Sequence, residues 1–247
     1  TMRDRKEKIE ELEQIASSYH LSAEQPDLFI ENACQEHCCD WIEQLIPAQS
    51  LVLELGFGDG IVTARISQQA RQYDIVEGAT LIAAKARQAY PEAQVFHELF
   101  EHFVAPIQYD YILAGHVLEH VDSPVELLKR MRGWLTPQGR IIVVVPNAES
   151  IHRQLAVLMG IQSELDSLSP RDELVGHQRV YDAERIRADF AEAGYRVEEE
   201  RGFFLKALPN GMMLDYSAEL IDALNRISAR LPPRMLANLG FVIAADG

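Results

Sequence analysis

Short apolar segments alternate along this chain with segments of helical periodicity, and this alternation constrains the fold more than any other feature. The run Arg140–Val145 is almost entirely β-branched after its first residue and ends at Pro146, and Leu51–Leu55 is another mainly apolar run. Strands this apolar are typical of a parallel sheet that helices cover on both faces. We predict strands at 51–55, 73–76, 94–96, 109–114, 140–145, 196–205 and 239–244. The pattern therefore predicts a doubly wound α/β fold, with ligands bound beyond the carboxyl ends of the strands.

Two amphipathic helical segments, 3–18 and 27–46, precede the first strand, and Pro47 ends the second of them. We expect residues 1–47 to form an N-terminal helical cap on one domain of residues 48–247. Further helices are predicted around 60–70 and at 79–89, 124–135, 182–193 and 211–230. Residues 147–180 interrupt the alternation with a helical pattern and then a polar stretch that contains proline and glycine. A long connection of this kind predicts a lid or substrate loop.

The charge balance excludes some partners. The chain has 38 acidic and 23 basic residues, a net charge of −15, and such a surface repels a phosphate backbone. We therefore expect no nucleic-acid partner. No apolar stretch approaches the roughly 18–20 residues of a membrane-spanning helix, so no membrane association is expected. The first 15 residues contain no apolar segment suited to a signal peptide, which favours a cytoplasmic location.

The cysteines are clustered in one predicted helix, as Cys34, Cys38 and Cys39 beside His37. Cys34 and Cys38 share a helical face, but no second pair of ligands at zinc-like spacing occurs elsewhere in the sequence. We interpret the cluster as buried free thiols of a reduced compartment, and we expect no metal.

A glycine-rich turn, ELGFGDG at 54–60, follows the first predicted strand. Its glycines are spaced G-x-G-x-G, whereas a dinucleotide site usually reads G-x-G-x-x-G. Glu54 stands two residues before the first glycine, where its carboxylate would repel a pyrophosphate but attract a cationic ammonium. S-adenosylmethionine carries an ammonium and a sulfonium and has no phosphate. The loop therefore favours this cofactor over a nicotinamide dinucleotide.

A second acidic residue, Glu77, ends the second predicted strand. A carboxylate in this place accepts two hydrogen bonds from a ribose diol. The alternative is an acid that stabilises the start of the following helix. The glycine loop upstream favours the ribose role.

The motifs ELGFGDG, DIVEG, VFHELFEHF, YDYILAGHVLEHV and LTPQGRIIVVVPN resemble, in order and spacing, those of class I S-adenosylmethionine-dependent methyltransferases. The resemblance covers residues 48–147 closely. It implies a Rossmann-like sheet of seven strands whose last two form an antiparallel hairpin. The later segment GHQRVYDAERIRADFAEAGYRV resembles members of the family that modify small metabolites.

The resemblance also implies which residues contact the cofactor. Glu54, Gly56 and Gly58 would hold the methionine end of the cofactor. Gly60 would pack the loop. Glu77 would bind the ribose, with Gly78 beside it. The adenine would be flanked by Leu99 and Phe100, and the methyl-bearing end would contact Gly115 and His116.

Methyl transfer is an in-line displacement that requires alignment and, for many acceptors, removal of a proton. Candidate catalytic residues are His116, His120, His177 and Tyr181, and candidate substrate-binding residues are His152, Arg153 and Arg179. Alternatives stay open. His120 also suits a core or capping role, His177 a packing role, and the arginines surface ion pairs.

The sequence thus predicts a methyltransferase that acts on an oxygen or nitrogen of a small-molecule metabolite. The alternatives are an NAD(P)-dependent oxidoreductase on a similar sheet and a non-catalytic module that binds the cofactor. A homodimer is left open.

Overall fold

The computed structural model describes residues 5–20 and 25–246. A single sheet of seven strands forms its centre, in the order β3-β2-β1-β4-β5-β7-β6. The strands are β1 Leu51–Leu55, β2 Gln72–Glu77, β3 Gln94–His97, β4 Tyr109–Gly115, β5 Leu135–Pro146, β6 Tyr195–Phe203 and β7 Asn238–Ala245. The first five are parallel, and β7 runs antiparallel between β5 and β6. The predicted Rossmann-like sheet with an antiparallel last hairpin is confirmed.

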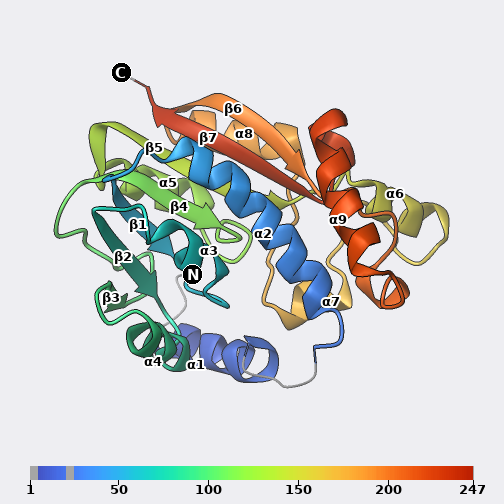
Figure 1. The fold of residues 1–247 in the computed structure, drawn as a ribbon, viewed down its shortest axis with the longest axis horizontal. Coiled ribbons are helices and arrows are strands. Elements are labelled where there is room, and N and C mark those ends of the chain that lie inside the picture. The colour runs from blue at the N-terminus through green and yellow to red at the C-terminus, as the bar shows by residue number, and fades with distance from the viewer. Residues whose placement is uncertain (1–4, 21–24, 247) are drawn as a thin grey trace.

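Helices cover both faces of this sheet (Figure 1). They are α1 Arg5–Ile15, α2 Leu28–Leu45, α3 Ile61–Ile66, α4 Thr80–Ala89, α5 Pro124–Arg132, α6 Ile151–Leu158, α7 Pro170–Leu174, α8 Ala183–Glu192 and α9 Ala218–Arg226. One hydrophobic core joins α2, α4 and α9 to the sheet, and a second core joins α5 and α8 to it. Alternate residues of β5 divide between the cores, with Ile142 in the first and Ile141 and Val143 in the second. This two-sided burial explains why the strands read as continuous apolar runs.

The point where strand order reverses lies between β1 and β4, because β1 pairs with β2 on one side and with β4 on the other. Glu54, Glu77 and Gly115 therefore come to the same edge of the sheet, at or near the carboxyl ends of three neighbouring strands. The loops that follow these strands form one site at this edge.

The predicted helix 211–230 is wrong in its first half. A 3₁₀ turn forms at Asn210–Met212, and α9 begins at Ala218, where the side chain of Ser217 accepts a hydrogen bond from the backbone N–H of Leu220. A second 3₁₀ turn, Ile227–Arg230, follows α9 directly. Serine caps a helix in this way because its hydroxyl satisfies an N–H that has no partner within the helix. The first two residues of the predicted helix 3–18 lie outside the described residues.

The segment 147–180 contains two short helices: α6 lies in the part with the helical pattern, and α7 lies in the polar stretch. α6 and α7 are joined by a buried ion pair in which Nη2 of Arg153 lies 2.6 Å from Oδ2 of Asp172. Asp172 also completes a capping box with Ser169 at the start of α7. We refer to residues 147–180 as the lid segment. No helix in the described part of the chain is both long and apolar enough to cross a membrane.

Candidate active site

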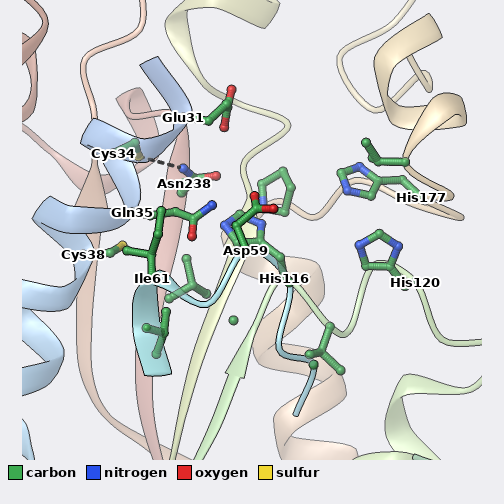
Figure 2. A pocket seen from close by; sticks show the side chains of 18 of the residues that line it. Glu31, Cys34, Gln35, Cys38, Asp59, Ile61, His116, His120, His177 and Asn238 are labelled. Carbon is green, nitrogen blue, oxygen red and sulfur yellow. Dashed lines mark hydrogen bonds between the residues drawn. The ribbon is translucent and has the colours of Figure 1, made fainter. Parts of the chain in front are cut away.

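A cavity of about 410 Å³ lies beyond the carboxyl ends of the parallel strands. Residues of the sheet and its loops, of the lid segment and of the N-terminal helices line it. The glycine loop and the ends of β1, β2 and β4 form one part, and the lid segment contributes residues between His152 and His177. The N-terminal helices contribute residues such as Leu12 and Glu31. Figure 2 shows His120 and His177 on one side of the pocket and Cys34 on the opposite side. Residues of the N-terminal helices and of the segment 147–180 therefore both line the cavity.

The glycine loop exposes its backbone to this cavity. Gly56, Gly58 and Gly60 have φ angles of +80°, +52° and +81°, a region that side chains rarely adopt. A Cβ at Gly58 would meet no atom within 4 Å, whereas one at Gly60 would lie 2.6 Å from the ring of Phe57. Gly56 and Gly58 line the cavity, but Gly60 does not. Gly58 is thus bare toward a ligand, and Gly60 is bare because Phe57 occupies the space.

Glu54 lies at the cavity wall and is 4% exposed. Its carboxylate accepts hydrogen bonds from the hydroxyls of Thr63 and Tyr73, the latter at 2.8 Å. Burial raises the pKa of Glu54 to about 8, only partly offset by these hydrogen bonds. Within the described residues no lysine or arginine forms an ion pair with Glu54. A cationic ammonium beside this carboxyl would favour its ionised form and pair with it, so Glu54 fits the methionine end of the cofactor.

Glu77 ties the glycine loop to the start of α4. Its Oε2 accepts a hydrogen bond from the backbone N–H of Phe57 at 3.0 Å, and its Oε1 accepts one from Ala79 at 2.8 Å. A carboxylate has about four acceptor positions, so each oxygen keeps capacity for a ribose hydroxyl. Both readings of this residue are therefore compatible with its geometry, since it lines the cavity and also holds a helix start.

The neighbours predicted for the adenosine end differ in position. Phe100 lines the cavity, whereas Gly78 and Leu99 do not. A Cβ at Gly78 would lie 2.7 Å from the side chain of Leu12 in α1 and 3.2 Å from Leu99. Gly78 therefore allows the N-terminal helix to approach the sheet, and Leu99 packs behind it.

His116 follows β4 in a strained backbone conformation, with a φ of +55°. It lines the cavity together with Gly115. Its Nδ1 lies 3.1 Å from Oε1 of Glu119. Burial lowers the pKa of His116, but the hydrogen bond and charge of Glu119 outweigh this, so the pKa is raised. Sequence reasoning did not identify Glu119, although its position three residues after His116 was a usable signal.

His120 and His177 also line the cavity, and their ring centroids are 4.7 Å apart. His120 belongs to the turn that follows β4, and His177 follows α7 in the lid segment. Burial lowers the pKa of His120 to about 4, so its imidazole is neutral at physiological pH. The structure brings together these two of the predicted catalytic histidines.

Basic groups gather at the lid side of the cavity. His152, Arg153, Arg171 and Lys206 all line it. Arg153 is engaged by Asp172 and by the carbonyl oxygens of lid residues, so it holds the lid together. Burial, and then the charges of Lys206 and Arg153, lower the pKa of His152 to about 2, which keeps it neutral.

The sequence pattern did not identify Lys206 as a residue of the cavity, because a single lysine after an apolar strand belongs to no motif. Burial also lowers the pKa of Lys206. Phe204, two residues earlier, is buried and lines the cavity.

Two residues that were predicted for substrate binding or catalysis lie away from the cavity. Arg179 donates hydrogen bonds to the backbone carbonyls of Leu118 and Val121, and Tyr181 is fully buried with its hydroxyl donating to Asp189 at 2.9 Å. Neither lines the cavity. The substrate role expected for Arg179 and the catalytic role expected for Tyr181 do not fit this placement, because their polar atoms are occupied within the fold.

The cysteines are free and buried. Burial raises the pKa of Cys34 to about 12, and likewise raises that of Cys39 to about 12. The Sγ of Cys34 accepts a hydrogen bond from Asn238 at 3.4 Å (Figure 2). The interpretation as buried thiols is confirmed.

Sheet order, the bare glycine loop and two strand-end carboxylates define a methyltransferase of the class I fold. A family model described as a methyltransferase domain matches residues 30–200, more than half of the chain. The chain therefore belongs to this family and is an S-adenosylmethionine-dependent methyltransferase. This assignment favours the enzyme over the oxidoreductase alternative.

Solved structures share the fold at low sequence identity. One belongs to a complex of the Haloferax volcanii Trm112 methyltransferase activator and a methyltransferase, with a TM-score of 0.66, 14% identity and coverage of 96% of this chain and 98% of that chain. The CcbJ methyltransferase from Streptomyces caelestis has a TM-score of 0.61, 15% identity and coverage of 96% and 98%. The N-methyltransferase NodS from Bradyrhizobium japonicum WM9, in complex with S-adenosyl-L-homocysteine, has a TM-score of 0.58, 13% identity and coverage of 99% and 100%. No curated protein matches the chain in sequence.

Proposed function

We propose that the enzyme transfers a methyl group from S-adenosylmethionine to an oxygen or nitrogen of a small, acidic metabolite. The observation that carries this proposal is the position of the cavity, which is walled by the chain's own N-terminal helices and lid segment. Small-molecule sites occupy about 300–1,000 Å³. A cavity of about 410 Å³ that also holds the cofactor suits a small acceptor better than a folded macromolecule.

The preference for an acidic acceptor rests on Lys206. Arg153 is paired with Asp172, and Arg171 lies 3.6 Å from Glu31 as well as beside Asp27. No hydrogen bond or ion pair joins the ammonium of Lys206 to another residue in the part of the chain that the structure describes. A carboxylate or phosphate on the acceptor would complement this half-buried cation.

The cofactor would lie against Glu54 and the bare backbone of Gly56 and Gly58, and it supplies the electrophilic methyl group. The protein's share is alignment, which accounts for much of the acceleration of a displacement between two bound reactants. His116 is our candidate for the proton acceptor. Its Nδ1 is held by Glu119, and this leaves Nε2 available to a bound acceptor.

The test is a panel of small acceptors, acidic and neutral, incubated with the enzyme and S-adenosylmethionine. Formation of S-adenosylhomocysteine and a gain of one methyl group in the acceptor are measured together. We expect turnover on acidic acceptors, and a KM at least tenfold higher for Lys206→Met on these acceptors. Lys129→Met, at an exposed position of α5, is the matched control. Turnover confined to proteins or RNA, or an equal loss on neutral acceptors in Lys206→Met, would contradict the proposal.

NodS is an N-methyltransferase, and its whole chain aligns with this one. That likeness supports the fold, and the choice between oxygen and nitrogen rests on the acceptor panel.

A further inference from the structure

Three side chains with metal-binding atoms converge beside the cavity. Glu119, His120 and His177 each offer one ligand atom, and these atoms lie within 4.8 Å of one another. The first two belong to the turn after β4, and the third comes from the lid segment more than 50 residues later. Figure 2 shows the rings of His120 and His177 next to each other at one side of the pocket. The fold therefore brings the cluster together across two separate segments.

A contact of Nδ1 orients the imidazole ring of both His120 and His177. Nδ1 of His120 lies 3.3 Å from the carbonyl oxygen of Gly176, and Nδ1 of His177 lies 2.8 Å from Oδ1 of Asp172. A histidine that binds a metal almost always donates its second N–H to a backbone carbonyl or a carboxylate in this way. The contacts leave Nε2 of each ring free to act as a ligand.

The carboxylate of Glu119 is incompletely satisfied. The side chain is fully buried, and its Oε1 lies 3.1 Å from Nδ1 of His116 and 3.9 Å from Nε2 of His177. Its Oε2 has no hydrogen-bond partner among the described residues. A buried carboxylate oxygen without a partner is costly. A bound cation would supply the missing interaction.

We propose that Glu119, His120 and His177 form a binding site for a divalent first-row transition-metal ion. Two imidazole nitrogens and one carboxylate oxygen suit zinc, cobalt, manganese or iron, whereas magnesium prefers an all-oxygen site. Bonds of about 2.0–2.1 Å in a tetrahedral site place ligand atoms about 3.3 Å apart, so the groups need to move inward by about 1 Å.

The position of the site gives the metal a role in the cavity. His120 and His177 both line it, so the coordination positions that the protein does not fill face the ligand side. Water or an acceptor oxygen would occupy them. The metal would also join the turn after β4 to the lid segment, which hydrogen bonds from Gln178 to the backbone of Glu119 and His120 already hold together.

Metal binding is tested without reference to methyl transfer, so its failure is distinguishable from failure of the proposed function. Full-length protein without a histidine tag is stripped with a chelator and titrated with Co²⁺, with Zn²⁺ and, in parallel, with Mg²⁺. We expect one equivalent of Co²⁺ with visible absorption bands of a four- or five-coordinate site, displacement of Co²⁺ by Zn²⁺, and much weaker binding of Mg²⁺. Absence of stoichiometric binding of both Co²⁺ and Zn²⁺ to the wild-type protein would overturn the proposal.

Variants assign the ligands. His120→Gln and His177→Gln should each weaken Co²⁺ binding at least tenfold, while His102→Gln, at an exposed position, should leave it unchanged. Binding that survives both ligand variants at full strength would also overturn the assignment. Pulsed electron paramagnetic resonance on the copper-loaded wild-type protein should detect two coordinated imidazoles. This measurement keeps the test decisive if a variant does not fold, because detection of none contradicts the site.

Discussion

The carboxylate of Glu77 accepts a hydrogen bond at 3.0 Å from the backbone N–H of Phe57, which lies in the glycine loop 20 residues earlier in the chain. The same side chain accepts a second hydrogen bond from Ala79 at the start of α4. One residue thus fixes the glycine loop on which we propose that the cofactor lies, fixes the start of the following helix and lines the cavity.

Glu77→Ala should therefore weaken cofactor binding and also destabilise the fold. The loss of charge-assisted hydrogen bonds to the ribose is worth roughly 1.5–3 kcal/mol each, and each N–H left without a partner costs about 1–3 kcal/mol. Calorimetric titration and thermal unfolding measure the two effects separately. Glu77→Gln keeps one acceptor oxygen. Relative to the wild type, it should therefore lose less of the stability of the fold than of the affinity for the cofactor. Unchanged cofactor affinity in Glu77→Ala would contradict the assignment.

Glu54 should make cofactor binding release a proton. With its pKa raised to about 8 by burial, this carboxyl is mostly protonated at pH 7 before binding. An ammonium beside it favours the ionised form, so the proton leaves. Calorimetry at pH 7 in two buffers of different ionisation enthalpy counts the protons released. The count should fall toward zero in Glu54→Gln, and an equal count in this variant would exclude Glu54 as the source.

The raised pKa of Glu54 should also make the free energy of unfolding of the cofactor-free protein depend on pH. A carboxyl whose folded pKa is raised favours folding when it is protonated. Its contribution is fullest below the unfolded value of about 4.5, and it is lost as pH rises toward about 8. Denaturant unfolding of the wild type and Glu54→Gln across this range should give curves that converge toward low pH. A difference that is constant with pH would contradict the raised pKa.

Gly58 and Gly60 should separate binding from folding. Gly60→Ala brings a Cβ to 2.6 Å from the ring of Phe57 in a left-handed conformation, so it should lower stability by about 1–3 kcal/mol. Gly58→Ala shares the conformational cost, but its Cβ would meet no protein atom within 4 Å and lies at the cavity, where we propose that the cofactor binds. We expect it to have the larger effect on cofactor affinity relative to stability. Equal ratios of the two effects in both variants would contradict this division.

Arg153→Met should loosen the lid segment without unfolding the sheet. The variant leaves the carboxylate of Asp172 buried without its cation, and removal of one partner from a buried pair costs about 3–5 kcal/mol. Hydrogen exchange should rise in residues 161–175 and stay unchanged in β4. Arg187→Met, which removes an exposed partner of Glu200, is the control. Unchanged exchange in the lid segment would show that the pair does not hold it.

The strands were predictable because a strand that is buried on both faces has a continuous run of apolar residues, as in Arg140–Val145. The positions of Glu54 and Gly58 at the cavity were predictable because Glu54 lies near the end of β1 and Gly58 lies in the loop directly after it. The residues on the lid side of the cavity were not predictable in this way. Arg153 and Arg179 read alike in the sequence, yet long-range contacts place one in the cavity wall and the other on backbone carbonyls. Lys206 gains its position from tertiary packing, which no local pattern encodes.

The N-terminal helix and the lid meet at Gly176. A Cβ there would lie 2.5 Å from Ile15, so the absence of a side chain at Gly176 allows the close approach, and the φ of +80° also suits glycine. Ile15 itself lines the cavity. A side chain at position 176 would therefore require the side chain of Ile15, and with it this part of the cavity wall, to shift.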